Sequence, residues 1–454
     1  MGTIRIEQAG REYTLVQSNK GLRVEFGGAE IFRHWPDDVP PDTGGEPEPG
    51  PGPADPPVEP DPDPDPGPVT PPPVPTPTPP PASNGYPTPP IPASFETVAT
   101  ASELMAAING RRAAIGLADG AYGDIKISSR GAPVLVFAIN PGKAVFRSIL
   151  FSGADNVTFV APMFINDRQG LYTAQTPQTM WRVEANCSDI HLFDARGYGA
   201  PDHANYRNWT IAEWKARKID AALVRGARCS VVRCDWSAVY FGPQLHAGKE
   251  NAVIYNVVRG FSADAYRAVG GPDHIMRGNR SYDAFQIDAN HSDGGQFWSI
   301  GPTGGAGGGV MYGLTYEDNL HVADAGPASR DPNAAPLAMM QGMGGFNGRF
   351  DGWTVRRNTI VTHAAAHHGI TLAGCDNSLI EGNMVLDLAG RITGGKGYEE
   401  VYINIGAGSV GTILRNNIGA KITLNGVSQI GLNGNAQPDY SRIDLAAIIA
   451  KVTA

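Results

Sequence analysis

The fold of this chain is decided by a stretch whose pattern recurs along most of the sequence. Residues Pro272 to Trp298 read PDHIMRGNRSYDAFQIDANHSDGGQFW. The stretch begins with a short apolar strand that ends in Asn279, and the densest cluster of ionisable side chains in the sequence follows directly. Scaffold and candidate chemistry therefore meet in one segment.

The short strand ending in asparagine is repeated from about residue 156 to Gly431. The best-matched copies end in Asn256, Asn279, Asn319, Asn358, Asn383 and Asn417. Their spacing of roughly 22 to 40 residues is typical of a solenoid with insertions. A single unit has too few apolar residues for a core of its own, so consecutive units must stack. We expect each asparagine to lie at a tight corner with a left-handed φ and to hydrogen-bond the next coil as a ladder.

An amphipathic helix is predicted just before the repeats. Residues 100–108 offer Thr100 or Ser102 as N-cap and place Leu104 and Ile108 on one apolar face. Short strands separated by Asp-Gly and Gly-Ala turns follow. Because the first coil of a stacked β structure would otherwise expose its core, we expect this helix to cover it.

A second helix is predicted in the C-terminal tail, residues 437–454. Ser441 is its expected N-cap, and Ile448 and Val452 are among its apolar positions. Such a helix caps the coil or packs against other copies of the chain, and the sequence does not choose between the two.

The N-terminal part of the chain has two segments of different composition. Residues 1–35 alternate apolar and polar side chains and predict a small β-rich domain of three or four strands, marginal by itself. Residues 36–92 are rich in proline and acidic residues, which predicts an extended linker. The repeats then fill residues 93–436. The N-terminus lacks a basic segment followed by an apolar run, so no signal peptide is expected.

Composition excludes several kinds of protein. Among 454 residues the net charge is -9, which disfavours a sequence-independent nucleic-acid binder because phosphate neutralisation needs a basic face. No apolar run is long enough to insert into a membrane. The cysteines, Cys187, Cys229, Cys234 and Cys375, lack zinc-ligand spacing and are expected to be buried as small apolar residues.

The segment around residues 264–298 carries the candidate chemistry. Glycosidic hydrolysis needs two carboxyl groups, one protonated and one ionised. We predict Asp288 and Asp293 as acid and base or nucleophile, assisted by His291, while Asp264 on the preceding unit is an alternative partner for either. The residues predicted to hold substrate are Asp264, Tyr266, Arg267, Tyr282, Gln296, Trp298, Asp318 and His321.

Insertions between the repeats are expected to gather on one face and line a groove. They cover residues 198–220, 301–310 and 325–349. The first carries Tyr206, Trp209 and Trp214, whose rings either stack on sugars or pack on the coil. For His363, His367 and His368 we expect solvated turn residues rather than metal ligands.

The irregular repeat with its Asn corners resembles the right-handed parallel β-helix of pectate-lyase-like proteins, over roughly residues 95–431. A small β domain, a proline-rich linker and a capped coil without a signal peptide look like a bacteriophage tailspike or tail fibre depolymerase. The run from His291 to Gln296 is similar to an H-x-D-G-x-Q segment of β-helical phage and carbohydrate-active proteins, whose matching positions lie in the groove.

The resemblance implies an all-β, single-stranded coil in a virion tail, which forms a homotrimer and is attached to phage tail or baseplate proteins through residues 1–35. The expected activity is depolymerisation of a bacterial surface polysaccharide, with hydrolysis preferred because the cluster is acidic and contains no lysine. No cofactor is then required.

Two alternatives stay open at this point. A polysaccharide lyase would neutralise a uronate with Arg267, Arg277 or Arg280, or with calcium on Asp288 and Asp293, and abstract a proton with His291 or a tyrosine. A tail adhesin would bind glycan without cleaving it.

Overall fold

The computed structural model describes residues 2–8, 11–18, 21–26, 29–34, 86–173, 176–289, 291–301, 304–326, 336, 338–363, 368–392 and 401–454. The chain forms two compact units, residues 1–70 and 71–454. Within the first unit an antiparallel sheet runs in chain order through β1 (Gly2–Gln8), β2 (Arg11–Ser18), β3 (Gly21–Phe26) and β4 (Ala29–His34). This agrees with the alternation in the sequence. The predicted linker lies outside the described residues up to residue 85.

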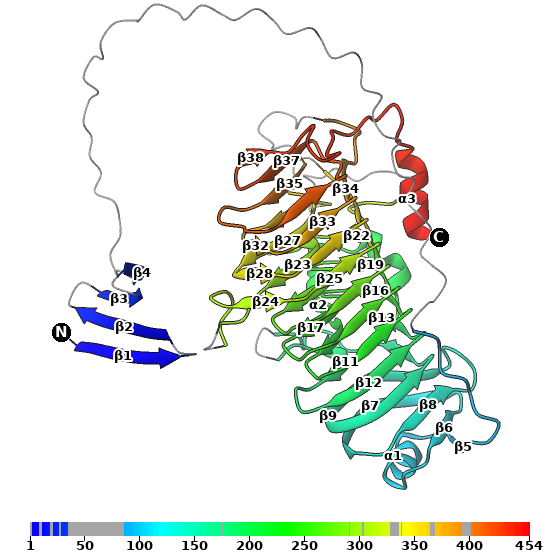
Figure 1. Ribbon diagram of the computed structural model, residues 1–454. Coiled ribbons are helices and arrows are strands. Elements are labelled where there is room, and N and C mark those ends of the chain that lie inside the picture. The colour runs from blue at the N-terminus through cyan, green and yellow to red at the C-terminus, as the bar shows by residue number, and fades with distance from the viewer. Residues whose placement is uncertain are drawn as a thin grey trace, which may run out of the picture. The chain divides into compact units, whose positions relative to one another are not determined.

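The second unit is a parallel β coil with three faces (Figure 1). Face 1 consists of β5 (Glu96–Val98), β6 (Ala114–Leu117), β8 (Val134–Ala138), the end of β9 (Ala144–Val160), β12 (Ser188–Phe193), β15 (Ser230–Val232), β18 (Ala252–Ile254), β21 (Ile275–Arg277), β25 (Thr315–Glu317), β29 (Thr354–Arg356), β33 (Leu379–Glu381) and β36 (Ile413–Arg415). Face 2 consists of β10 (Met163–Ile165), β13 (Arg196–Tyr198), β16 (Asp235–Val239), β19 (Val257–Phe261), β22 (Arg280–Ala284), β26 (Leu320–Val322), β30 (Thr359–Thr362) and β34 (Met384–Asp387).

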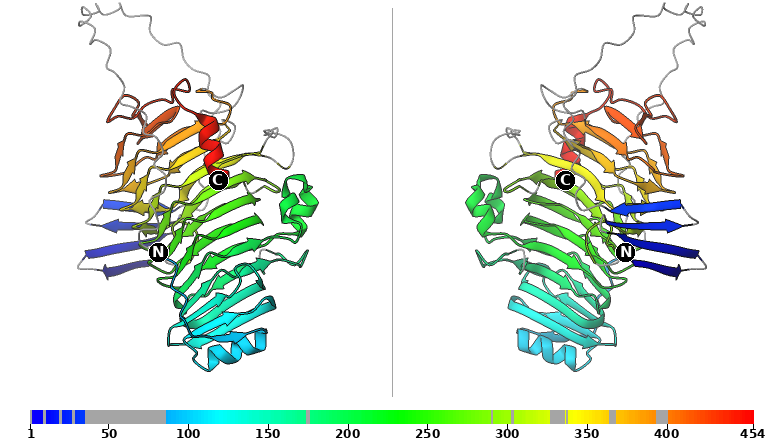
Figure 2. Two further views of the ribbon diagram at one scale, coloured as in Figure 1. Left: turned by 90° about the vertical axis from the view of Figure 1, so that its right-hand side faces the viewer. Right: turned by 90° about the vertical axis from the view of Figure 1, so that its left-hand side faces the viewer.

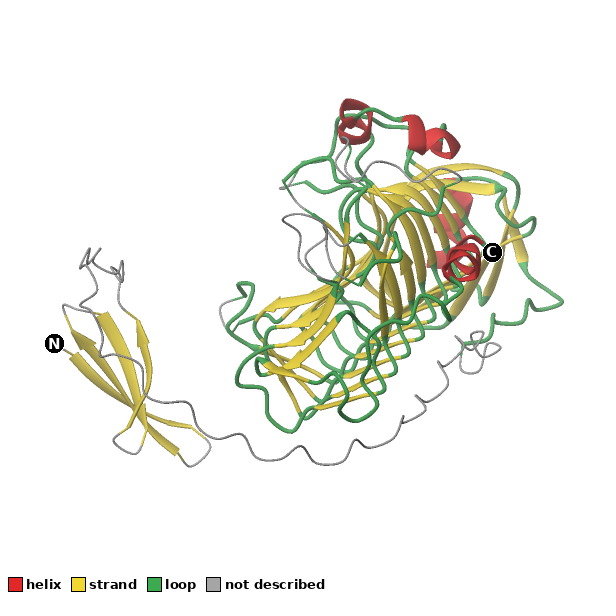
Figure 3. Cartoon of the chain, turned by 90° about the horizontal axis from the view of Figure 1, so that it is seen from above, coloured by secondary structure: helices red, strands yellow, loops and turns green. Residues whose placement is uncertain are grey.

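Face 3 consists of β11 (Thr179–Val183), β14 (Asp220–Val224), β17 (Pro243–His246), β20 (Arg267–Val269), β23 (Ser292–Trp298), β27 (Met340–Asn347), β31 (Ile370–Leu372), β35 (Tyr402–Ile405) and β37 (Lys421–Leu424). The strand β38 (Val427–Ser428) pairs antiparallel with β37, β7 (Gly120–Arg130) pairs along β9, and a small separate sheet joins β24 (Val310–Tyr312), β28 (Arg349–Asp351) and β32 (Cys375–Asp376). Seen from above, the strands of successive coils lie one behind another (Figure 3). The predicted right-handed parallel β-helix is confirmed.

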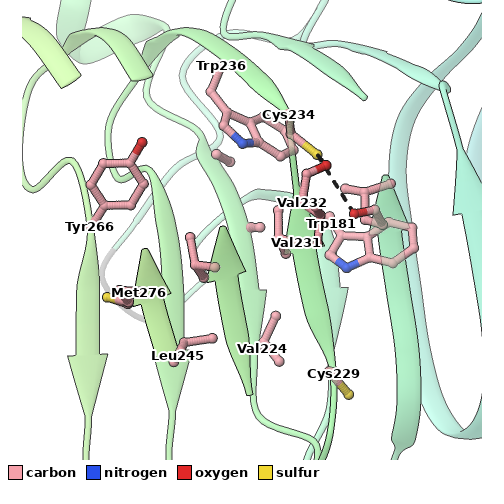
Figure 4. Packing of buried hydrophobic residues seen from close by; sticks show 14 of the residues in the cluster. Trp181, Val224, Cys229, Val231, Val232, Cys234, Trp236, Leu245, Tyr266 and Met276 are labelled. Atoms are coloured by element: carbon pink, nitrogen blue, oxygen red, sulfur yellow. Dashed lines mark hydrogen bonds between the residues drawn. The ribbon is translucent and has the colours of Figure 1, made fainter. Parts of the chain in front are cut away.

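The core fills the inside of the coil. Large aromatic side chains stack from coil to coil near its N-terminal end, where the rings of Phe151 and Trp181 lie 4.6 Å apart. Further along, aliphatic residues such as Val224 and Leu245 lie in the interior beside aromatic ones such as Tyr266 (Figure 4). The four cysteines are buried and free, as the sequence predicts.

The predicted asparagine ladder is present and fully buried. Asn279, for example, receives a hydrogen bond from Asn256 Nδ2 at 3.2 Å and donates one to Asn319 Oδ1 at 3.0 Å. The expected left-handed φ of these asparagines is wrong, because the residue before each takes it, as Gly278 and Asp318 do. The chain reverses one position earlier, which turns the amide inward to reach the next coil.

The first coil is covered by α1 (Ala101–Asn109). Thr100 is its N-cap and forms a capping box with Glu103, so the first of the two predicted caps is confirmed. The apolar side chains of Leu104 and Ile108 enter the core of the coil.

The C-terminal helix α3 (Leu445–Thr453) begins later than expected, because Asp444 rather than Ser441 accepts the capping hydrogen bond. It lies alongside the strands of the coil (Figure 2), where Ile448 and Val452 pack with residues of face 2 such as Val322. The helix therefore covers a side of the coil and does not close its end.

Insertions are concentrated at the junction of faces 2 and 3. There the chain forms η1 (His203–Asn208) and α2 (Ile211–Ala216), which stand out from the coil in Figure 2. Residues 323–339 join β26 to β27 at the same junction, whereas residues 301–309 lie between faces 3 and 1. Among the described residues, no helix is both long enough and apolar enough to cross a membrane.

Candidate active site

Three aspartates stand in register on face 3. The pairing aligns Leu223, Gln244, Arg267 and Gln296 on four successive strands. The positions three residues earlier are then Asp220, Phe241, Asp264 and Asp293, and the backbone bond from Ala265 N to Asp293 O agrees with this alignment. Since neighbouring strands are about 4.8 Å apart, acidic side chains occupy three of four rungs over a short distance.

Burial dominates the electrostatics of these acids. Asp220 is 3% exposed and Asp264 is 1% exposed. Loss of hydration raises the pKa of each carboxyl to about 7. Burial also raises the pKa of Asp293, and its charge adds to the rise at Asp264. The row therefore keeps its protons to a higher pH than ordinary aspartates do, although Arg267 opposes the rise in the pKa of Asp264 and favours its ionised form.

Arg267 lies at the centre of the row. Its Nε and Nη2 donate to Asp264 Oδ2 at 3.0 and 2.6 Å, and Nη2 also donates to Gln296 Oε1 at 3.0 Å. The guanidinium lies 3.8 Å from the ring centre of Phe241 and 4.8 Å from that of Trp298. The arginine is thus fixed in place, and its charge is compensated by Asp264.

His291 connects the buried row to solvent. Its Nδ1 lies 3.0 Å from Asp293 Oδ1, and the histidine side chain is 43% exposed while the carboxyl has no exposed surface. The bond to Asp293 raises the pKa of His291, against a smaller opposing effect of burial. Asp293 and His291 form a carboxyl–imidazole pair whose outer member, His291, is exposed at the surface.

Asp288 has a different environment. Its Oδ2 lies 2.8 Å from Nζ of Lys218, which follows α2, and its side chain is 27% exposed. The ammonium of Lys218 also lies 4.0 Å from the ring centre of Tyr240. The structure thus corrects the expectation that the cluster contains no lysine, because the long insertion brings Lys218 to it.

Tyr240 lies among these charges. Burial raises the pKa of its hydroxyl to about 12, and the charges of Asp288, Asp264 and Asp220 contribute to the rise. Its ring contacts that of Tyr172 at 5.2 Å, and Tyr172 donates to Asp220 Oδ1 at 3.1 Å. Asp288, although on a loop, therefore belongs to the same cluster as the row on face 3.

Some polar atoms of the cluster lack a partner. Within the described part of the chain, Asp264 Oδ1 and Asp293 Oδ2 are buried and make no hydrogen bond. A buried polar atom without a partner costs free energy, so such atoms gathered on one face mark a place where a ligand or water completes the bonding.

Two of the predicted substrate-binding residues face the core instead. The hydroxyl of Tyr266 donates to the backbone oxygens of Asn256 and Arg280, and its ring lies among the core residues in Figure 4. The ring of His321 is fully buried between Ser281 and Tyr316, and burial lowers its pKa to about 3. Strand alternation turns these side chains inward, so the prediction that they bind substrate at the surface is wrong.

Tyr282 and Asp318 are half-buried and lie away from the face 3 cluster. Tyr282 belongs to face 2 and packs in the cluster beneath α3. Asp318 lies at the corner after β25, where both its oxygens accept from Arg357 at 2.7 Å. The predicted grouping of these two residues with the face 3 cluster is therefore not found.

The aromatic residues of the first insertion pack on the coil. Tyr206, Trp209 and Trp214 are at most 7% exposed and surround Phe285. They stabilise the insertion and offer no open ring to a sugar. Likewise His363 and His368 are buried rather than solvated, and His367 lies outside the described residues.

Four members of the cluster were not predicted from the sequence, namely Asp220, Lys218, Tyr240 and Gln244. Asp220 gave no signal in the sequence, because its alignment with Asp264 and Asp293 depends on the register of the strands. Lys218 gave none either, because it lies in an insertion whose path depends on packing. In the described ranges no group of three or more His, Cys, Asp or Glu side chains is arranged to hold a metal ion.

The fold and the site define a parallel β-helix protein with a carboxyl-rich cluster on one face. No family model and no curated protein matches the sequence. Solved structures with a similar fold include a mannuronic acid specific polysaccharide family 6 lyase from human gut microbiota, with 15% identity over 79% of this chain and 99% of that one and a TM-score of 0.41. Others are the Dettilon tailspike protein, with 12% identity over 69% and 62% and a TM-score of 0.38, and the A-module of an Azotobacter vinelandii mannuronan C-5 epimerase, with 12% identity over 71% and 95% and a TM-score of 0.37.

Proposed function

We propose that this chain is a polysaccharide depolymerase that hydrolyses glycosidic bonds at the face 3 cluster. The observation that carries the proposal is that one segment holds two carboxyl groups in unlike environments. Asp293 is buried and holds a raised pKa, whereas Asp288 is partly exposed and paired with Lys218. Hydrolysis needs one protonated acid and one ionised base, and unlike environments supply both.

The proton donor in this proposal is the pair formed by His291 and Asp293. The carboxyl of Asp293 has no exposed surface, so its proton reaches the leaving-group oxygen through the imidazole of His291. As the bond to the sugar breaks, positive charge develops on the ring, and the nearby carboxylates stabilise it. Asp288 takes a proton from water, the water oxygen bonds to the sugar carbon, and solvent returns the proton to His291.

Substrate binding is assigned to the remaining outward-facing groups of the cluster. Gln296 and Arg267 present amide and guanidinium donors, and the partly exposed ring of Trp298 beside them offers a flat surface to a sugar. Asp264 orients Arg267.

Hydrolysis is preferred to elimination because of the charge balance. Arg267 and Lys218 are each bonded to a carboxylate, so neither provides an uncompensated positive charge for a uronate. Elimination is the second candidate, favoured by the exposure of His291, which would then abstract the sugar proton as a base. The two reactions differ in product, because only elimination leaves a double bond.

We also infer that the polysaccharide belongs to a bacterial surface and that the protein is a phage-type receptor-binding protein. Support comes from the order of the parts along the chain. A separate four-stranded sheet comes first, a proline-rich segment follows, and the β coil comes last. A homotrimer is expected, with residues 1–35 attached to tail proteins. Light scattering on the purified chain measures the oligomeric state, and a monomer would contradict the trimer.

The proposal predicts the effect of removing each group. Asp293→Asn, His291→Gln and Asp288→Asn should each reduce kcat by about 100-fold or more, the usual contribution of a general acid or base. The measurement follows polysaccharide size, reducing ends and the ultraviolet absorbance of unsaturated sugars, with capsular polysaccharides and exopolysaccharides as substrates. Asp167→Asn, on an exposed aspartate, serves as control.

The products decide between the candidates. New reducing ends without unsaturation support hydrolysis, and unsaturation growing with cleavage supports elimination by His291. If the chain binds a polysaccharide tightly but never shortens it, the protein is an adhesin and not an enzyme.

A further inference from the structure

Face 3 continues beyond the cluster with the same register. Gln296 aligns with Gly344 on β27, Thr371 on β31 and Asn404 on β35. The outward-facing row that holds Arg267 and Gln296 therefore extends along the coil axis away from Asp293. Since strands are about 4.8 Å apart, Thr371 lies roughly 10 Å beyond the rung of Gln296.

An exposed aromatic ring lies on this extension. Phe346 is 43% exposed, and its ring occupies the space above Gly344. A Cβ at Gly344 would lie 2.7 Å from the Phe346 ring, so any other residue there would displace the ring. The edge of His368 supports the ring, with centroids 4.9 Å apart. The glycine thus allows a flat apolar surface to rest against the strand, one rung beyond Trp298.

A buried hydroxyl lies beside this ring and has no partner. Thr371 is 5% exposed, and its Oγ1 makes no hydrogen bond among the described residues. Asp264 Oδ1 and Asp293 Oδ2, on earlier rungs, are also buried and make no hydrogen bond among the described residues. Unpartnered polar atoms are therefore spread over face 3 from Asp264, just before β20, to Thr371 on β31, much farther than one sugar unit extends. An elongated polar ligand satisfies them all only when it runs along the coil axis.

We propose that Phe346 and Thr371 form a distal sugar-binding subsite, so that the substrate lies along the coil axis and reaches about two rungs beyond the cleavage site. The proposal rests on the proposed function and specifies its substrate as a long oligosaccharide. Phe346 stacks on the apolar side of a sugar ring, and Thr371 bonds one of its hydroxyls.

The test measures binding by calorimetry, using size-fractionated oligosaccharides of the polysaccharide that the wild-type chain binds in a screen of neutral, uronate-containing and sulfated polymers. Phe346→Ala should weaken binding of long oligosaccharides by roughly two- to tenfold and leave binding of the shortest ones unchanged. Phe95→Ala is a matched control, because Phe95 is 40% exposed, covers Gly116 in the same manner and lies on face 1.

Thr371→Val gives a second readout. Because the hydroxyl has no partner in the free protein, the valine should not lower the midpoint of thermal unfolding of the free chain. It should, however, weaken the binding of long oligosaccharides. A lower midpoint without ligand, or equal binding of long oligosaccharides by the Phe346→Ala variant and the wild type, would overturn the subsite and leave the proposed function standing. If the Phe346→Ala variant binds long oligosaccharides more weakly but the wild type cleaves none, the subsite is supported and the proposed hydrolase activity is rejected. No binding to any polymer in the screen would overturn both.

Discussion

At the scale of single residues, burial assigns the chemistry. Asp288 and Asp293 are five positions apart and identical in type, yet one is paired with a lysine at the surface and the other lies beneath His291. The pKa of a carboxyl is set by its hydration and its neighbours, which the residue type does not reveal.

The pairing of His291 with Asp293 makes a prediction about titration. Because the bond to Asp293 raises the pKa of His291, NMR of the imidazole should give a value above 6.5 in the wild type and a lower one in Asp293→Asn. The stabilisation from this raised pKa is complete below the unfolded value and is lost as pH rises through the folded one. An unchanged titration in the variant would show that the pair does not form.

Asp220 makes a separate prediction about stability and pH. Its folded pKa of about 7 exceeds the ordinary 3.8, so between these values the folded chain holds a proton that the unfolded chain has released. Stability therefore falls as pH rises through this interval, by up to roughly 4 kcal/mol from this group. Asp220→Asn keeps an acceptor for Tyr172 and should flatten the decline measured by denaturant unfolding. A slope equal to that of the wild type would mean that Asp220 is ionised throughout.

At the scale of elements, face 1 carries a ladder of alternating charge. Arg277, Glu317, Arg356, Glu381 and Arg415 are aligned in register on five successive strands. Glu317 is only 1% exposed and is bonded by Arg277, Arg356 and Arg357. Although burial raises the pKa of Glu317, its arginine partners outweigh burial and hold it below the ordinary value.

This ladder predicts that the same substitution lowers the free energy of unfolding by different amounts at Glu317 and at Glu381. Glu317→Gln should lower the free energy of unfolding by roughly 2–4 kcal/mol, because it leaves several arginines without their shared carboxylate. Glu381→Gln, where the carboxylate is 25% exposed and bonded to Arg415, should cost no more than about 1 kcal/mol. Denaturant unfolding compares them, and equal costs would refute the special role of Glu317.

At the scale of the whole coil, α3 protects a side that would otherwise expose apolar residues. Val322, Val361 and Leu386 of face 2 pack in the cluster with Ile448 and Val452 of the helix. The sequence left open whether this helix closes the end of the coil, and the packing answers that it covers a side.

A charge beneath the helix should detach it. Val452→Asp buries an unpaired carboxylate and should cost about 3 kcal/mol or more, with binding of a hydrophobic dye as face 2 becomes exposed. Ala447→Asp, on the exposed side of the same helix, is the control. If the two variants behave alike, α3 does not protect the coil.

The sequence by itself determined the coil, its asparagine ladder and its helical N-terminal cap, because these depend on short patterns that every coil repeats. It also drew attention to Asp264, Asp293 and His291, since those residues share one segment or neighbouring repeats. Only the tertiary structure decided that Tyr266 and His321 face the core, that Lys218 reaches Asp288 and that Asp220 stands in line with Asp264. The physical reason is that inward or outward orientation depends on the register of each strand, and an insertion follows whatever apolar surface it covers.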